Sequence, residues 1–470
     1  MLQTDAGSGE VRYSVTNNIS YMYQVYCSYI MLFKNGAKQD NFMAAQHLQD
    51  GLNKLVRKYY QPVAGWFDVR GDDIDVVYYA DKFNDPPFTV QTLGIDGQEL
   101  AGEVHRSNVE LLVPQCPSGF ISKENRDIPM FLVRATYLES NEAMTLGVTY
   151  HHSLMDGTAF WTFMNNWACM CKQIYDNVGL DSVPLIPNPP LFGMPDLGCL
   201  HESGLRFEHS EYSLVNSSSF TRVFLPGKDE IRENLLVISV EQQQELRRMA
   251  REFGVSFNTI LCAIIWKEIS VLRYRARPST AEDLSLFTCA TNPRAQLGLP
   301  KNLCASPVVN LAAPRSIGEI AAMELRDVAL LVDETVAKGT AEYIYSSTHY
   351  LLAQRRREID DEKMGVAGDK LMLVYVCPAY AKCVVSSSRN FPIYQSDFGF
   401  GRPEYVRPPY LPFDGCMRIW PTPLSAGSGA SNDEAPLEIY MSLPDYVDFT
   451  QSPLLSPYVV SAYPVKSDHI

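Results

Sequence analysis

The amino-acid sequence predicts a two-domain protein that contains both helices and strands. The chain has 470 residues, which is more than one hydrophobic core usually serves, so we expect two domains of roughly 200 residues each. Hydrophobic residues make up 46% of the sequence and aromatic residues 11%, enough apolar material for a sizeable core. Segments with helical apolar spacing and short strand-like runs occur in both halves of the chain. This mixture indicates a fold built from both helices and strands.

In the first half we expect an amphipathic helix, a strand, a hairpin and a second helix. Apolar residues recur at helical spacing over residues 41–60, and the run at 74–79 has the composition of a strand. Two further apolar runs, Phe131–Leu138 and Met144–Tyr150, flank a polar turn and predict a hairpin. The second helix begins near Gly157, because the residues that follow form one apolar stripe: Phe160, Trp161, Met164, Trp167, Ala168 and Cys171.

Clustered prolines divide the chain. Between residues 181 and 222 the periodicity fades, and the prolines there lie too close together for a helix or a central strand. We therefore interpret 181–222 as a crossover linker between an N-terminal domain, 1–180, and a C-terminal domain, 223–470. The elements predicted beyond the linker are helices at Ser239–Phe253 and Asn258–Tyr274 and strands at 370–377 and 436–442.

The charge and the cysteines narrow the function classes. A formal net charge of -14 argues against nucleic-acid binding, which normally requires a basic surface. The N-terminal residues lack the features of a signal peptide, and nowhere do 18 apolar residues follow one another. The eleven cysteines are scattered without a CxxC pair, which favours reduced, mostly buried thiols. We expect a cytoplasmic, monomeric protein without a metal site or a membrane partner.

The peptide His151-His152-Ser153-Leu154-Met155-Asp156-Gly157 carries the strongest chemical signal. It lies between a predicted strand and a predicted helix, a junction where functional residues often occur. A neutral imidazole there can take the proton of an attacking hydroxyl or amine. The two histidines could equally be buried, hydrogen-bonded residues, and Asp156 could be the N-cap of the helix. Gly157 would let the chain turn sharply.

A second peptide, Asp397-Phe398-Gly399-Phe400-Gly401, predicts a tight turn. Its first three residues match a metal-binding motif of protein kinases, but the sequence has neither an HRD catalytic loop nor a glycine-rich phosphate loop. A kinase is therefore excluded.

The two peptides together resemble the signatures of the BAHD acyltransferase family, HxxxD and DFGWG. Their order and separation fit, and the resemblance covers nearly the whole chain. The segment LNKLVRKYYQPVAGWF is similar to a helix of that family and the YPLAGR segment that follows it, and TNPRAQL is similar to its GRxR stretch. The resemblance implies the α/β fold class, with two chloramphenicol-acetyltransferase-like domains, each with a mixed β-sheet flanked by helices, and a channel between them.

The resemblance also implies the reaction. His152 would lie midway along the channel as the catalytic general base, while the acceptor attacks an acyl-CoA thioester in a ternary complex without an acyl-enzyme. Acyl-CoA would be a co-substrate, with no permanently bound cofactor, and the acceptor would be a small-molecule alcohol or amine of specialised metabolism. Asp156 would form a structural ion pair with Arg294. Three residues of the second peptide would also be structural: Asp397, Gly399 and Gly401.

Several positions depart from the family pattern. Phe400 replaces the usual tryptophan and loses its N–H donor. Leu303-Cys304-Ala305-Ser306 replaces the family's YFGN stretch, so the resemblance does not determine the contacts of these residues with coenzyme A. At the offset of the Thr/Ser-x-Trp element of hydroxycinnamoyltransferases the chain has Ser386-Ser387-Ser388, and Ser386 could contact an oxyanion or a substrate, or be a surface serine.

Two other functions fit the same motifs. A carrier-protein-dependent condensation enzyme also uses HHxxxDG but takes its acyl group from a tethered pantetheine. A non-catalytic binding protein could keep the fold, although it would need no base at His152. The second peptide and the lack of an attached carrier domain favour the acyl-CoA enzyme.

Overall fold

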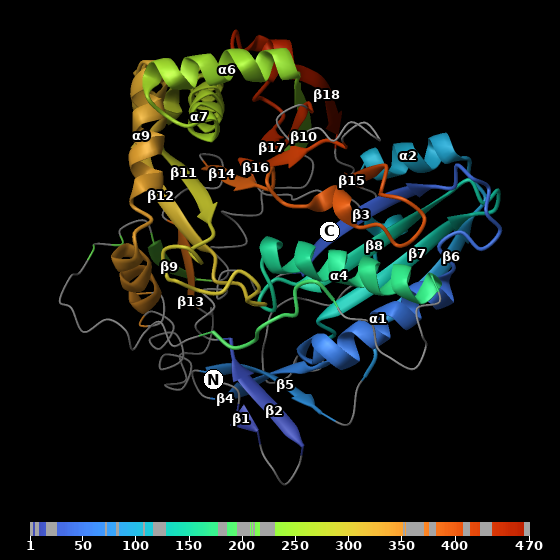
Figure 1. Cartoon of the computed structure of the whole chain (residues 1–470). Helices are drawn as coiled ribbons and strands as arrows, with labels where there is room; N and C mark the ends of the chain where they lie inside the picture. The colour runs from blue at the N-terminus through green and yellow to red at the C-terminus, as the bar shows by residue number, and fades with distance from the viewer. Residues whose placement is uncertain are drawn as a thin grey trace. The chain divides into compact units, whose positions relative to one another are not determined.

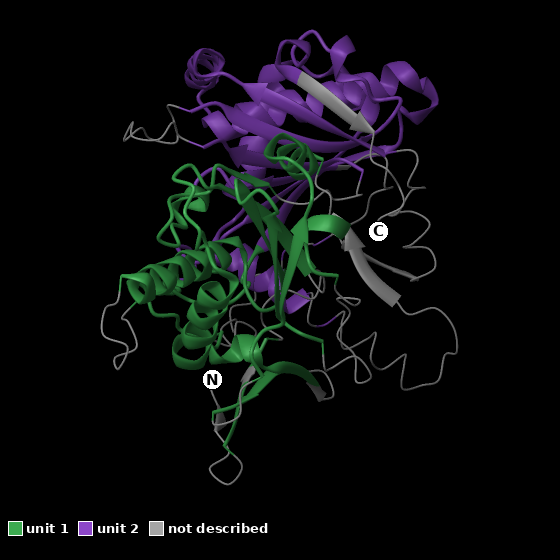
Figure 2. Ribbon diagram, turned by 90° about the vertical axis from the view of Figure 1, so that its right-hand side faces the viewer, with its two compact units in different colours: residues 1–200, 298–308, 391–409 green, residues 201–297, 309–390, 410–470 purple. Residues whose placement is uncertain are grey.

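A computed structural model (Figure 1) describes most of the chain. The residues that it describes are 3–4, 9–15, 26–70, 73–80, 84–106, 109–115, 128–176, 186–194, 207, 209, 212–216, 231–350, 353, 371–375, 382–407, 414–423 and 435–464. They form two compact units (Figure 2). Unit 1 consists of residues 1–200, 298–308 and 391–409, and unit 2 of residues 201–297, 309–390 and 410–470.

This division is not the linear one expected from the sequence. Two segments of the second half, 298–308 and 391–409, pack within unit 1. The Asp397–Gly401 peptide therefore lies in unit 1, although the linear division places it in the C-terminal domain. Most of the expected linker at 181–222 lies outside the described residues, and its described part includes β9 (Tyr212–Asn216), which pairs with β13 (Leu371–Tyr375).

A five-stranded mixed sheet is the centre of unit 1. Its strand order is β15-β3-β8-β7-β6, and all neighbours are antiparallel except the parallel pair β6 and β7. The bounds are β3 Tyr26–Lys34, β6 Phe88–Leu93, β7 Phe131–Leu138, β8 Ala143–His151 and β15 Tyr405–Arg407. The predicted hairpin of β7 and β8 is confirmed, and Asn141 in its turn has a φ of 56°.

Helices cover both faces of this sheet (Figure 1). Successive side chains of a strand point to opposite faces, and on β3 Tyr29 packs on Phe160 at 4.8 Å between ring centroids, whereas Ile30 packs with Leu100. One face is thus covered by α1 (Ala45–Tyr59) and α4 (Gly157–Tyr175), which confirms both predicted helices, and the other by α2 (Gly97–His105). The short helices of this region are η2 (Gln61–Ala64) and α3 (Val109–Leu112).

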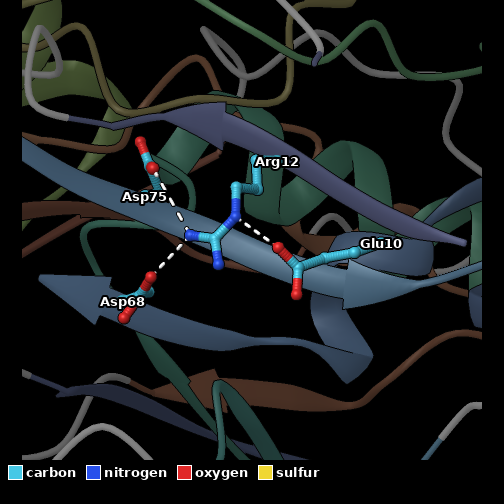
Figure 3. Close-up of polar contacts among 4 residues, drawn as sticks. All are labelled: Glu10, Arg12, Asp68 and Asp75. Atoms are coloured by element: carbon cyan, nitrogen blue, oxygen red, sulfur yellow. Dashed lines mark hydrogen bonds and ion pairs between the residues drawn. The ribbon is translucent and has the colours of Figure 1, made fainter. Parts of the chain in front are cut away.

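A second, antiparallel sheet of unit 1 holds a charged cluster. Its strand order is β1 (Gln3–Thr4), β2 (Glu10–Ser14), β5 (Asp73–Tyr79) and β4 (Trp66–Arg70). Asp68 and Asp75 are directly opposite each other on β4 and β5, a destabilising pairing of like charges. Arg12 of β2 offsets it: Nη1 lies 2.5 Å from Asp68 Oδ2 and 3.7 Å from Asp75 Oδ2, and Nε pairs with Glu10 (Figure 3).

Unit 2 is built on a seven-stranded mixed sheet. The strand order is β12-β11-β14-β16-β17-β10-β18, in which β14 is parallel to both of its neighbours and the remaining pairs are antiparallel. The bounds are β10 Ile231–Ile238, β11 Leu284–Thr291, β12 Val309–Ser316, β14 Lys382–Ser387, β16 Cys416–Pro421, β17 Leu437–Pro444 and β18 Val459–Pro464. The predicted strand at 436–442 corresponds to β17, and the one at 370–377 to β13 of the separate pair.

The helices of unit 2 pack on this sheet around α7. Their bounds are α6 Val240–Phe253, α7 Phe257–Ala276, α8 Ile317–Ala322 and α9 Leu325–Ala337, with short helices η4 Pro278–Thr280, η8 Phe449–Gln451 and η9 Ser456–Tyr458. Helix α7 is buried almost all round, which places it at the core of this unit. Within the described residues no single helix is long and apolar enough to cross a membrane; α6 and α7, bent by 96°, reach that length and composition only as a pair.

Candidate active site

The predicted active-site peptide joins β8 to α4 in unit 1. Strand β8 ends at His151, and α4 begins at Gly157 with Asp156 as its N-cap. The Asp156 carboxylate accepts the backbone N–H of Ala159 at 2.9 Å, which satisfies one of the free donors at the start of the helix. The two regular elements therefore fix both ends of the peptide that carries the histidines.

His151 is a structural residue. Its side chain is fully buried, with its ring 4.7 Å from that of Phe67 and 5.2 Å from that of Tyr26. Its Nδ1 accepts the backbone N–H of Ser153 at 3.2 Å, so the proton of the neutral ring resides on Nε2. An imidazole that is enclosed and engaged in this way is not accessible to a substrate.

His152 is the histidine that remains accessible. Its side chain is only half-buried, and its Nδ1 lies 3.2 Å from the Oγ of Ser306. Its ring lies 6.1 Å from that of Tyr150, which is fully buried. Burial raises the pKa of the Tyr150 hydroxyl well above its usual range, so this neighbour stays neutral and does not compete for a proton near pH 7. Of the two histidines, His152 is the more accessible one, and its role as a general base stays a prediction.

Segment 302–306 supports this peptide from the other side. The N–H of Asp156 donates to the carbonyl oxygen of Ala305 at 3.0 Å, next to Ser306. The segment is itself held by Leu191, whose carbonyl accepts the N–H of Cys304 at 2.7 Å. From the sequence, Leu303–Ser306 was noted only because it differs from the family's YFGN stretch, and the contact of Ser306 with His152 was missed. The one signal in the sequence is that a serine stands where YFGN has its asparagine.

The Asp397 peptide forms a closed turn. The Asp397 carboxylate accepts the N–H groups of Gly399 and Gly401, both at 2.9 Å. Both glycines have positive φ values, 102° and 99°, which residues with a Cβ rarely adopt. A structural role was predicted for these three residues, and this turn is the structure in which they would have it. The positive φ values explain why glycine is needed at both positions.

This turn belongs to a segment that follows α4 along its length, and we call residues 391–407 the strap. The strap contacts the start of α4 through Phe391, its middle through Ser396 Oγ, which donates to Asn165 Oδ1 at 2.7 Å, and its end through the ring of Phe400. Asn165 Nδ2 also donates to the Pro392 carbonyl at 3.3 Å, directly before the short helix η6 (Ile393–Gln395). Phe398 packs on Trp167 with ring centroids 5.1 Å apart, and β15 pairs with β3. The strap thereby fixes the helix that carries the active-site peptide.

Gly157 is required for space. A Cβ on this residue would approach Cε2 of Phe391 to 2.6 Å, closer than real Cβ contacts. Its φ is not positive, so the constraint is steric and not conformational. Phe391 was not identified from the sequence.

The two remaining predicted site residues lie in unit 2. Arg294 follows β11, is 5% exposed and donates from Nη1 to Asn292 Oδ1 at 3.0 Å. Ser386 lies on β14 with an exposed side chain. Since His152 and Asp156 belong to unit 1, the Asp156–Arg294 ion pair, the channel and a substrate contact of Ser386 all stay predictions.

Four of the described thiols do not have the properties of nucleophiles. Burial raises the pKa of Cys171, Cys262 and Cys383, and that of Cys289 to about 11, which keeps these groups protonated and unreactive at neutral pH. Among the residues that the structure describes, no three or more His, Cys, Asp or Glu side chains are arranged to hold a metal ion.

Comparison with known proteins assigns the class. The model of the family described as "Transferase family" matches residues 9–446. Over 403 residues the chain is 24% identical to rosmarinate synthase of Plectranthus scutellarioides, covering 83% of this chain and 84% of that protein. It is 23% identical to anthranilate N-benzoyltransferase protein 1 of Dianthus caryophyllus, covering 82% of each chain. The structure of TRI101 from F. graminearum, complexed with coenzyme A and T-2 mycotoxin, superposes with a TM-score of 0.72 at 15% identity, covering 96% of this chain and 99% of that one.

The fold is thus that of the chloramphenicol-acetyltransferase-like α/β transferases, with a mixed sheet flanked by helices in each unit. The chain belongs to the Transferase family, the BAHD acyltransferases, and is an acyl-CoA-dependent acyltransferase.

Proposed function

We propose that the protein transfers an acyl group from acyl-CoA to a hydroxyl or amine of a small molecule of specialised metabolism, with His152 as the general base. The observation that carries the role of His152 is the contrast between the two adjacent histidines. His151 is fully buried and accepts a backbone N–H on Nδ1, whereas His152 is half-buried and has its Nδ1 3.2 Å from the hydroxyl oxygen of Ser306. A base needs such an accessible imidazole.

The acyl group passes directly from the thioester to the acceptor, without a covalent acyl-enzyme. The acceptor oxygen or nitrogen attacks the thioester carbonyl carbon while His152 takes its proton. The carbon–sulfur bond then breaks, coenzyme A leaves as a thiolate, and the proton on His152 passes to that sulfur. Holding both substrates beside the base supplies orientation as well as proton removal. The buried, protonated thiols of Cys171, Cys262, Cys289 and Cys383 do not have the properties of an acyl carrier.

The relatives support both kinds of acceptor. One is named as an anthranilate N-benzoyltransferase and another as a shikimate O-hydroxycinnamoyltransferase. The net charge of -14 supports small-molecule partners over nucleic acid. The proposal includes a monomeric, cytoplasmic enzyme.

The test incubates the purified protein with a panel of acyl-CoA donors and of hydroxyl and amine acceptors. Free thiol is followed with a chromogenic reagent and products by mass spectrometry. Thiol release that requires an acceptor, with double-reciprocal lines that intersect, supports direct transfer in a ternary complex. Parallel lines together with an acyl adduct that acceptor discharges would exclude it.

Two further arms separate the alternatives. An acyl group loaded on a pantetheinyl carrier protein replaces acyl-CoA as the donor, and transfer from the carrier alone would identify a condensation enzyme. Tight binding of acyl-CoA or acceptor without turnover for any pair would identify a binding protein.

A further inference from the structure

We infer that Ser306 is the positioning residue of His152: its hydroxyl oxygen accepts a hydrogen bond from the Nδ1–H, so that the basic lone pair, which takes the proton of the acceptor, is on Nε2. The inference deepens the proposed function and rests on His152 being the base. The direct observation is the 3.2 Å separation of His152 Nδ1 and Ser306 Oγ, residues 154 positions apart in the chain.

Both partners of this contact have fixed positions. Ser306 is fully buried, and the residue before it accepts the N–H of Asp156 at 3.0 Å. Asp156 in turn caps α4, and His152 directly follows the last residue of β8. The 302–306 segment and the active-site peptide are therefore joined at two points within unit 1, once through the backbone and once through the imidazole. A side chain held on such a frame can orient a ring reproducibly.

The chemistry decides which way the hydrogen bond must run. A neutral imidazole has one proton, so Nε2 is basic only when Nδ1 carries it. With the Nδ1–H donating to Ser306 Oγ, the basic nitrogen is Nε2. After proton transfer the ring is cationic, and the same oxygen accepts a stronger, charge-assisted bond from Nδ1. The serine hydroxyl thus favours both the reactive tautomer and the protonated state that follows.

The same pair of residues also has the composition of a nucleophile and its base. The burial of Ser306 argues against that role, because a fully enclosed hydroxyl has no access to a thioester. An acyl-serine would be seen directly as an added mass on the peptide that contains Ser306, which makes this alternative an outcome of the test.

The experiment compares Ser306→Ala, Ser306→Thr and His152→Ala in the full-length chain, at matched protein concentration and with thermal melting as a check on folding. We expect Ser306→Ala to lower kcat by about 10- to 100-fold, less than loss of the base, with the KM for acyl-CoA within about twofold. The acidic limb of its kcat/KM profile should move to lower pH by about half a unit, because the imidazolium loses its acceptor. Ser306→Thr keeps the hydroxyl and should restore most of the rate and the limb.

Ser396→Ala is the matched control. Ser396 is also fully buried in unit 1 and also makes a side-chain hydrogen bond, to Asn165 at 2.7 Å, so its loss has a comparable structural cost. Its melting temperature should fall, but its acidic limb should stay at the wild-type pH. A shift of equal size in both variants would mean that Ser306 acts only through stability.

The tautomer gives a readout that does not depend on the rate. Nitrogen-15 chemical shifts of the histidine rings, with the His152 signal assigned from its absence in His152→Ala, should show a protonated Nδ1 in the wild type and a mixture of tautomers in Ser306→Ala. A wild-type ring protonated on Nε2, an unchanged rate and limb in Ser306→Ala beside an inactive His152→Ala, or an acyl adduct on Ser306 would each overturn the inference. Full activity of His152→Ala would instead refute the part of the proposed function that makes His152 the general base.

Discussion

Phe391 lies directly over Gly157, so that a Cβ on the glycine would come within 2.6 Å of the phenylalanine ring. Gly157→Ala should therefore lower both stability and turnover, since overpacking costs about 1–3 kcal/mol, more than the helical preference of alanine returns. Thermal melting and kcat check this. Phe391→Leu in the Gly157→Ala background should restore part of both. A double variant no better than the single one would show that Phe391 is not the obstacle.

The two adjacent histidines should respond very differently to substitution. His152→Ala should lower kcat by at least about 10² with little change in melting temperature, because it removes a positioned base from a half-buried site. His151→Ala should instead lower the melting temperature, because it leaves a cavity beside Phe67, and should cost much less in turnover. Equal losses of turnover in two folded variants would mean that both rings take part in the reaction.

Substitutions of Asp156 can separate its role as the N-cap of α4 from its predicted ion pair with Arg294. Asparagine caps helices about as well as aspartate, so Asp156→Asn keeps the hydrogen bond to the Ala159 N–H and removes only the charge. If the predicted ion pair with Arg294 exists, Asp156→Asn and Arg294→Ala should each cost about 3–5 kcal/mol of the free energy of unfolding. Asp156→Ala, which also removes the cap, should cost about 1 kcal/mol more than Asp156→Asn. Denaturant unfolding measures all three, and a wild-type stability of Asp156→Asn would exclude the ion pair.

The charged cluster of the second sheet predicts a compensating pair of substitutions. Arg12→Met leaves Asp68 and Asp75 opposed across β4 and β5 without their shared cation, and should lower the melting temperature by several degrees. Asp75→Asn added to Arg12→Met should recover part of the loss, because it removes one of the like charges. Asp75→Asn alone is the control. If the double variant is as unstable as the sum of the single ones, repulsion between the two carboxylates is not the cause.

His105 predicts a dependence of stability on pH. Burial and the nearby Arg407 lower the pKa of His105 in the folded protein below its usual value of 6.5. The unfolded chain then binds the proton more readily, so the stabilisation is present above about pH 6.5 and is lost as the pH falls toward the folded pKa. His105 is nevertheless exposed to solvent, which screens these influences, so the effect is small. His105→Asn should lose less stability than the wild type between pH 7 and pH 5 in parallel denaturant titrations, and a steeper loss in the variant would refute the sign.

Local features of the chain were predictable, and long-range ones were not. The apolar stripe from Phe160 to Cys171 predicted α4 because helical periodicity depends only on residues three or four positions apart in the sequence. The same local information does not distinguish His151 from His152, because the difference lies in the packing of Phe67 and Tyr26 around the first of them. Nor does it show that Tyr405 pairs with Leu32 across two halves of the chain, or that a serine at position 306 reaches His152.

The strap also determines when unit 1 can be completed during synthesis. A ribosome that has released the first 200 residues has made β3, α4 and both histidines, but β15 and the Asp397 turn are still about half a chain away. Until they emerge, β3 at the edge of the sheet has no β15 to pair with, and α4 lacks the strap residues that fix it. We therefore expect the nascent N-terminal part to stay incompletely folded and prone to aggregation over this interval. Pulse-labelled chains halted before residue 391 should therefore be digested quickly by protease, whereas chains extended past residue 409 should become resistant.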